Sequence, residues 1–205
     1  MGFAMHFDVL TLLLFGLIWI GIATFLRLKK KKSLAYLIFF TLFYVYLFKV
    51  LDYTLIQFQS LLLLKYFSPH LILNGQAPGE TMNLIPLIAL TPQDLKTSLL
   101  NILLMIPFGF GLPFITNLRL KKVAIIGALF SIVTEILQLI TGFIAGIAFR
   151  IADINDVIFN TLGVVVGYLL FVGFVRIYRH ASHNWDISAN SILRYIAERP
   201  QIDRQ

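Results

Sequence analysis

Residues 131–167 read SIVTEILQLITGFIAGIAFRIADINDVIFNTLGVVVG, and this stretch decides the fold of the chain. It is almost wholly apolar, yet it carries acids, amides and one arginine. An Asp at the centre of a membrane helix costs ~2.5–3.5 kcal/mol on insertion scales, so such residues usually face a bundle interior, a partner or water. The polar residues concerned are Glu135, Gln138, Arg150, Asp153, Asn155, Asp156 and Asn160.

The polar and small residues of this stretch recur at intervals of three and four. This is the spacing at which side chains share one face of a helix. The first set is Ser131, Glu135, Gln138 and Gly142, and the second is Asp153, Asp156, Asn160, Gly163 and Gly167. Two apolar helices thus each carry one polar, small-residue stripe. The simplest arrangement packs the two stripes against each other.

The composition predicts an integral membrane protein. Of its 205 residues 59% are hydrophobic and only 13% are charged, with a mean hydropathy of +0.85. A soluble domain carries roughly 25% charged residues. The chain has no cysteine, which excludes disulfides, thiolate metal sites and a cysteine nucleophile. Its four histidines lie near the ends and in a loop, so a Ser–His triad is not expected. We predict no cofactor.

We predict an all-α, polytopic membrane bundle of about five transmembrane helices. The expected spans are residues 8–26, 33–50, 93–116, 123–141 and 153–175, each about long enough for a hydrocarbon core of ~30 Å. Pro107 and Pro113 are expected to break or kink the third span. Residues 54–91 form the longest non-spanning segment, of which the first part is expected to lie in the membrane interface.

Basic residues predict the orientation. The segments 27–32, 119–122 and 176–205 together hold thirteen of the seventeen Lys and Arg residues. Cytoplasmic loops are enriched in Lys and Arg, so these segments are expected inside. The N-terminus is then outside and the C-terminus inside. The net charge of +7 is explained in the same way, and no nucleic-acid partner is expected.

Several motifs, taken together in order and spacing, resemble the VanZ-like family over about residues 30–175. They are Asn83-x-x-Pro86, Asn101 followed by Pro107-x-Gly109 and Pro113, Ser131-x-x-x-Glu135-x-x-Gln138, and Arg150-x-x-Asp153-x-x-Asp156-x-x-x-Asn160-x-x-Gly163. The resemblance implies a small multi-pass protein of the bacterial cytoplasmic membrane. The founding member of that family is linked to low-level teicoplanin resistance without a change in the peptidoglycan precursor terminus.

The resemblance also divides the chain. Residues 1–32 are expected to form the first transmembrane helix and a basic cytoplasmic loop, and residues 33–176 the VanZ-like membrane domain. Residues 177–205 are expected to form a polar cytoplasmic tail. Within the tail, residues 188–198 carry a small apolar face that predicts a short helix.

A candidate ligand-binding site follows from the polar stripes and the motifs. Arg150 could hold a phosphate or carboxylate through a bidentate contact. Glu135, Asp153 and Asp156 could bind an amine, a sugar or a cation, or act as general acid and base. A two-acid metal site of Glu135 and Asp153 would favour Mg²⁺ or Ca²⁺, but it lacks histidine ligands, and no metal is included in the prediction. The full candidate set is Asn83, Asn101, Glu135, Gln138, Arg150, Asp153, Asp156 and Asn160.

The same residues also fit a purely structural polar network. Arg150 would then neutralise Asp153, and Asp156 would cap or pair near the start of the fifth helix. Glu135 would be protonated or hydrogen-bonded to Gln138 or Asn160, because buried polar groups need partners and burial disfavours a charged carboxylate.

Two classes of function remain in view. The first is a non-enzymatic membrane factor that affects susceptibility to teicoplanin-type glycopeptides or binds an envelope lipid. The second is a membrane-embedded enzyme that acts on a lipid-linked envelope substrate through Glu135 with Asp153 or Asp156. A transporter is less favoured, since no inverted repeat is evident. The expected partners are membrane lipids and a lipid-linked precursor or glycopeptide, and the oligomeric state is left open.

Overall fold

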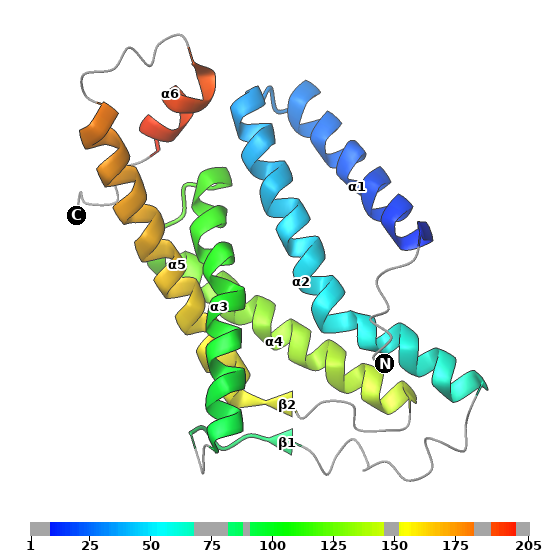
Figure 1. Cartoon of the computed structure of the whole chain (residues 1–205). Helices are drawn as coiled ribbons and strands as arrows, with labels where there is room; N and C mark the ends of the chain where they lie inside the picture. Colours follow the sequence, from blue (N-terminus) through cyan, green and yellow to red (C-terminus); the bar gives the residue numbers. More distant parts are fainter. Residues whose placement is uncertain (1–8, 68–81, 88–90, 146–151, 183–189, 200–205) are drawn as a thin grey trace.

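The computed structural model describes residues 9–67, 82–87, 91–145, 152–182 and 190–199. In these segments the chain is helical apart from two short strands (Figure 1). In chain order the elements are α1 (Val9–Leu28), α2 (Leu34–Phe67), β1 (Met82–Asn83), α3 (Pro92–Ile115), α4 (Leu120–Ala145), β2 (Ala152–Asp153), α5 (Ile154–Ala181) and α6 (Ser191–Ala197).

Five of the described helices are long and apolar enough to cross a membrane. The candidate spans are Thr11–Leu28, Leu34–Asp52, Pro92–Ile115, Leu120–Ile140 and Ile154–Ala181. The five-span, all-helical prediction is therefore confirmed.

The second predicted span is present as Leu34–Asp52, but its helix is longer than that span, and the third span contains no break. α2 does not end near residue 50 but continues to Phe67, and Figure 1 shows that it changes direction in its second half. Residues 53–67 contain no glycine or proline, so nothing in them stops a helix. α3 runs unbroken through Pro107 and Pro113, and its first turn is held by a capping box between Thr91 and Asp94.

The core of the bundle is the contact between α3 and α5, the most extensive contact between any two elements. Glycines allow the two backbones to meet. A Cβ on Gly163 would lie 2.3 Å from the carbonyl oxygen of Ile102, and one on Gly167 would lie 2.0 Å from that of Ile106. From the opposite side, a Cβ on Gly109 would lie 1.9 Å from the carbonyl oxygen of Val164.

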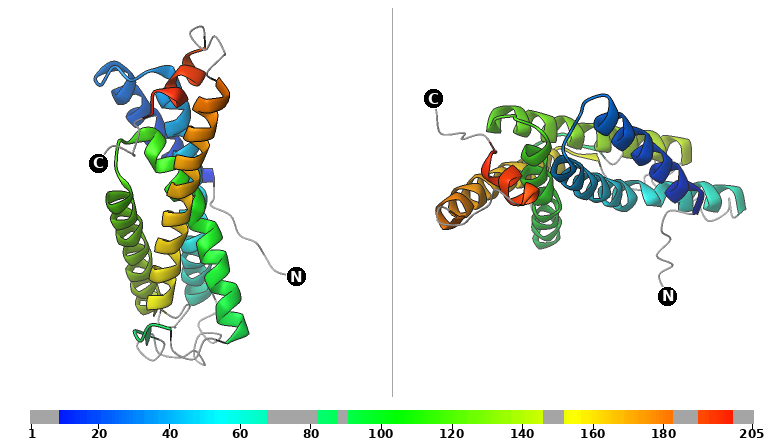
Figure 2. Two further views of the ribbon diagram at one scale, coloured as in Figure 1. Left: turned by 90° about the vertical axis from the view of Figure 1, so that its left-hand side faces the viewer. Right: turned by 90° about the horizontal axis from the view of Figure 1, so that it is seen from above.

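This contact corrects part of the stripe prediction. Gly163 and Gly167 were expected to face the fourth helix together with the polar residues of their stripe. They face α3 instead, as does Asp156, and the residue of the stripe that is hydrogen-bonded to α4 is Asn160. α5 therefore lies between α3 and α4 and contacts both (Figure 2).

α1 packs along α2. The indole Nε1 of Trp19 donates to Thr41 Oγ1 at 3.1 Å, and the hydroxyl of Tyr44 donates to the carbonyl oxygen of Phe15 at 2.8 Å. The two hydrogen bonds join α1 to α2 at successive turns. Outside this contact, the side chains of α1 are largely exposed on the molecule.

The predicted short helix of the tail is present as α6, and it is docked on the bundle. Tyr195 is buried, and its hydroxyl donates to the carbonyl oxygen of Phe114 at the end of α3. Arg199 Nη1 donates to the same carbonyl at 3.0 Å, and Arg179 Nε of α5 donates to the carbonyl of Ala197 at 2.9 Å. Burial raises the pKa of Tyr195, and the nearby Arg199 opposes the rise. The tail thus closes one end of the bundle.

The two ends of the molecule differ in character. The α1–α2 turn, the end of α5 and α6 lie toward the upper end in Figure 1, and the basic residues gather in and around these segments and the α3–α4 turn. The strands β1 and β2 lie at the lower end, beside the starts of α3 and α5.

Candidate functional site

The start of α5 is fixed by Asp153, which is its N-cap. Asp153 Oδ1 accepts a hydrogen bond from the backbone N–H of Asn155 at 2.8 Å and from Asn83 Nδ2 at 3.0 Å. The second bond is possible because β1 and β2 pair in parallel, with Asn83 opposite Asp153. A two-residue strand pair therefore brings together two polar side chains that lie 70 residues apart.

A second amide ties the segment after β1 to the same helix end. Asn155, which is buried, accepts a hydrogen bond from the backbone N–H of Leu87 at 2.8 Å through Oδ1. Leu87 has a φ of 58°, a left-handed conformation that is uncommon for a side chain of this size. Within the turn, Asn83 Oδ1 accepts from the backbone N–H of Ile85. Asn83 and Asn155 together hold the turn against α5.

One helical turn further along α5, Asp156 faces α3. Asn101 Nδ2 donates to Asp156 Oδ1 at 2.6 Å, and both side chains are partly buried. A hydrogen bond to an ionised acceptor is short and about twice as strong as a neutral one. Asp156 also lies in the first turn of α5, where the helix dipole favours negative charge. The pair joins α3 to α5 between the start of α5 and the glycine contacts.

A buried polar contact lies between α4 and α5. Asn160 Nδ2 donates to Ser131 Oγ at 2.8 Å, and both residues are buried. Thr134 Oγ1 donates to the backbone carbonyl of Ser131 at 2.7 Å. Glu135 lies one turn further along α4 and is only 9% exposed, and Gln138 follows on the same face; both make interactions in the structure. A buried acid is thus placed beside a chain of neutral polar groups.

Most of the predicted site residues are therefore brought to one region of the molecule. Asn83 and Asp153, Asn101 and Asp156, and Asn160 with Ser131 form three successive contacts along the first two turns of α5. Glu135 and Gln138 lie on the face of α4 that carries Ser131. Arg150 and the expected Arg150–Asp153 ion pair lie outside the described residues.

Of the two roles expected for Asp156, capping or pairing near the start of the fifth helix, the structure shows the pairing. Asp153, and not Asp156, caps α5, because the helix begins at Ile154 and the carboxylate of the preceding residue reaches the free N–H of Asn155. Asp156 pairs across helices with Asn101 instead.

Asn155, like Ser131, is a residue of this region that the sequence analysis did not assign to the site. It was counted among the polar residues of the central stretch, but no pattern in the sequence indicated its contact with Leu87. The available signal was a third polar side chain inside the DIND motif, at a helix start that is otherwise apolar.

The chemistry of the region is that of carboxylates held by amides. Among the described residues, no group of three or more His, Cys, Asp and Glu side chains is placed to hold a metal ion. Asp153 and Asp156 accept hydrogen bonds from asparagine side chains, which fixes the positions of their oxygens. Such an arrangement can present fixed acceptors to the amine, hydroxyl or amide donors of a ligand.

Comparison with known families gives one result. The family model described as VanZ/LLP1 matches residues 5–176, which is most of the chain. The match includes α1, which the sequence analysis placed outside its clearest resemblance, and it ends before α6. No curated protein and no solved structure matches the chain.

Proposed function

The chain belongs to the VanZ/LLP1 family, and from this premise we propose that it is a non-enzymatic membrane factor that binds the polar part of an envelope lipid. By doing so it affects susceptibility to teicoplanin-type glycopeptides, as the family resemblance implies. The observation that carries the proposal is the gathering of polar side chains from β1, α3, α4 and α5 at one end of an apolar bundle. Polar residues in spanning helices are costly and usually functional.

Packing alone does not account for this polar region. α3 and α5 already meet through glycines, which let backbones approach without any polar side chain. The acids and amides therefore add a free-energy cost of burying polar groups to a contact that the glycines already provide. A headgroup that carries hydroxyl, amide or amine donors would hydrogen-bond to these acceptors, and this interaction would account for their presence.

The two aspartates already have fixed hydrogen-bond partners, and this favours binding over catalysis. Asp153 is the cap of α5, and Asp156 is held by Asn101. An enzyme acting on a lipid-linked substrate is the second candidate, and one observation favours it. Glu135 is a buried acid at membrane depth, and burial is the usual way to prepare a general acid.

Glu135→Gln, which keeps the shape of the side chain and removes its ability to ionise, tests whether Glu135 belongs to a functional site of either kind. We expect the variant to accumulate and melt like the parent protein but to lose the effect on teicoplanin susceptibility in cells that depend on the chain. The matched control is Glu198→Gln, an exposed acid in the tail that forms only a loose pair with Arg194, at 3.8 Å.

Purified protein decides between binding and turnover. Incubated with a lipid-linked peptidoglycan precursor, the parent chain should bind the lipid in native mass spectrometry and leave its mass unchanged. A product that forms with the parent and not with Glu135→Gln would contradict the proposal in favour of the enzyme. A fully active Glu135→Gln in both assays would remove Glu135 from the site.

We also propose that the polar region faces outward, with the N-terminus outside and the C-terminus inside. Support comes from the basic α1–α2 turn, the end of α5 and α6, which lie toward one end of the molecule while β1 and β2 lie at the other (Figure 1).

Single cysteines test the orientation, because the chain has no cysteine of its own. In intact cells, a cysteine at Ser33 or Asn117 should be shielded from an impermeant thiol reagent, and one at Gln93 should react. All three positions are exposed on the molecule. The opposite labelling pattern would overturn the orientation and the outward-facing site together.

A further inference from the structure

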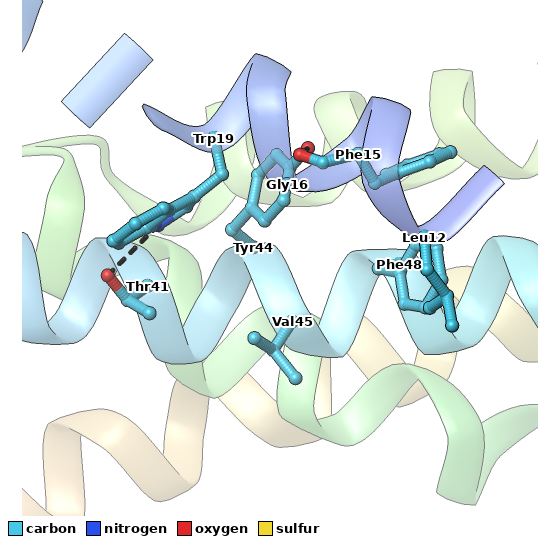
Figure 3. A pocket seen from close by; sticks show the side chains of 8 residues that line it. All are labelled: Leu12, Phe15, Gly16, Trp19, Thr41, Tyr44, Val45 and Phe48. Atoms are coloured by element: carbon cyan, nitrogen blue, oxygen red, sulfur yellow. Dashed lines mark hydrogen bonds between the residues drawn. The ribbon is translucent and has the colours of Figure 1, made fainter. Parts of the chain in front are cut away.

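A hollow of about 330 Å³ lies between α1 and α2, away from the polar region (Figure 3). Its walls are largely aromatic and include Phe15, Gly16 and Trp19 from α1 and Tyr44, Val45 and Phe48 from α2. Figure 3 shows Trp19 reaching from α1 to Thr41 on α2, with a hydrogen bond between them. Because the indole N–H and the Tyr44 hydroxyl both have partners, the hollow presents an apolar surface with its polar groups satisfied.

A second hollow, of about 310 Å³, continues along α1. Trp19 lines both hollows, and the second one ends at Arg27 and Leu28. Together they follow α1 from Leu12 to Leu28, a length of ~24 Å at ~1.5 Å per residue. One leaflet of a bilayer contributes about half of a ~30 Å hydrocarbon core. The path is therefore long enough for one acyl chain of a single leaflet.

The mouth of this path is basic and ordered. Arg27 Nη1 donates to the carbonyl oxygen of Lys32 at 2.9 Å, which closes the α1–α2 turn. Lys32 Nζ lies 4.7 Å from the centre of the Tyr36 ring, and Lys30 Nζ lies 5.9 Å from that of Phe25. Cations thus surround one end of an apolar path. This arrangement matches a phospholipid, in which an anionic headgroup is attached to an acyl chain.

We propose that α1 and α2 form a binding site for an anionic phospholipid. Its phosphate lies at Arg27 and the lysines of the turn, and one acyl chain runs along α1 past Trp19 into the hollow at Gly16. The site lies at the opposite end of the molecule from the proposed headgroup site and does not depend on it. Charge complementarity at the turn selects the lipid class, and the aromatic walls hold the chain.

Quenching of Trp19 by brominated lipid tests the site directly. The chain has two tryptophans, so Trp185→Phe leaves Trp19 as the one indole. In phosphatidylcholine vesicles, phosphatidylglycerol brominated in its acyl chains should quench Trp19 at a lower mole fraction than brominated phosphatidylcholine. Equal quenching by the two lipids would overturn the proposal.

Two pairs of variants separate a site from general attraction to a basic protein. Arg27→Gln with Lys30→Gln should weaken the preference for phosphatidylglycerol by on the order of tenfold. Lys121→Gln with Lys122→Gln removes equal charge from exposed positions in the other basic segment and should leave the preference unchanged. If the two double variants lose the same preference for phosphatidylglycerol, the lipid is attracted to the basic protein as a whole, and the proposed site is contradicted.

The hollow itself is tested with glycines. A side chain at Gly16 or Gly21 meets nothing within 4 Å, so both tolerate leucine, but only Gly16 lines a hollow. Gly16→Leu should reduce quenching by brominated phosphatidylglycerol, and Gly21→Leu should not. Similar quenching in the two variants overturns the acyl path. Quenching by neither lipid, together with a dimer in detergent, would assign the hollow to a second copy of the chain.

Discussion

Gly163→Ala should destabilise the protein by about 3 kcal/mol, at the upper end of the cost of overpacking a core. The added methyl group would lie 2.3 Å from the carbonyl oxygen of Ile102, which is backbone and cannot rotate away. The two helices must therefore separate or shift. Alanine is intrinsically favoured over glycine in a helix by up to ~1 kcal/mol, so the observed loss is already reduced by that gain. Thermal melting in detergent and the amount of folded protein in membranes measure it.

Gly173→Ala is the matched control, in the same helix. A Cβ at Gly173 meets nothing within 4 Å, so the variant should keep or slightly raise the melting temperature. The same chemical change in one helix should thus act in opposite directions at two positions. If Gly163→Ala melts as high as the parent, α3 and α5 are not in backbone contact there.

The contact between α3 and α5 contains three glycines, so the destabilisation by alanine can be predicted at more than one position. Gly167 lies one turn after Gly163 and approaches Ile106, the residue one turn after Ile102. Gly109 of α3 approaches Val164 of α5 in return. We expect alanine at each of these positions to destabilise, and two such changes to cost less than the sum of both, because the first already separates the helices.

The sequence predicted which residues face inward better than it predicted what they face. A spacing of three and four fixes the side of a helix, so the inward position of Gly163 and Asn160 followed from the pattern. The same spacing carries no information about the neighbouring helix. Asn160 does meet the fourth helix at Ser131, as predicted, whereas Gly163 meets the third.

The strand pair was beyond prediction for a related reason. Met82 and Asn83 form a segment too short for a period of two to appear, and Pro86 follows closely. The pairing with Ala152 and Asp153 is decided by tertiary contacts across 70 residues. Only the motif resemblance singled out Asn83, and it gave no partner. The Asn101–Asp156 hydrogen bond joins residues 55 apart in the chain, and it could not be predicted from the sequence for the same reason.

Asn101→Asp should be the most destabilising change in the polar region. It places two carboxylates where an amide now donates to Asp156 at 2.6 Å. At an effective dielectric constant near 20 the repulsion of two charges this close is on the order of 5 kcal/mol. The loss should be smaller at pH 5 than at pH 8, because protonation of one acid removes the repulsion. Melting curves at the two pH values measure it.

Exchange of the two side chains should recover the loss. In Asn101→Asp with Asp156→Asn, one amide again faces one carboxylate across α3 and α5. The negative charge leaves the first turn of α5, which costs ~0.3–1 kcal/mol of favourable interaction with the helix dipole. The double variant should therefore melt slightly below the parent and far above Asn101→Asp. A double variant as unstable as Asn101→Asp would mean that the two residues do not interact.

The double variant also separates a helix-to-helix pair from a binding site. If Asp156 serves only to join α3 to α5, recovery of stability should bring back the effect on glycopeptide susceptibility. If the ligand recognises the carboxylate at the start of α5, the exchanged charge lies on the wrong helix, and stability should return without function. The proposed headgroup site predicts the second result. Recovery of both properties would make this pair structural and confine the site to Glu135 and its neighbours on α4.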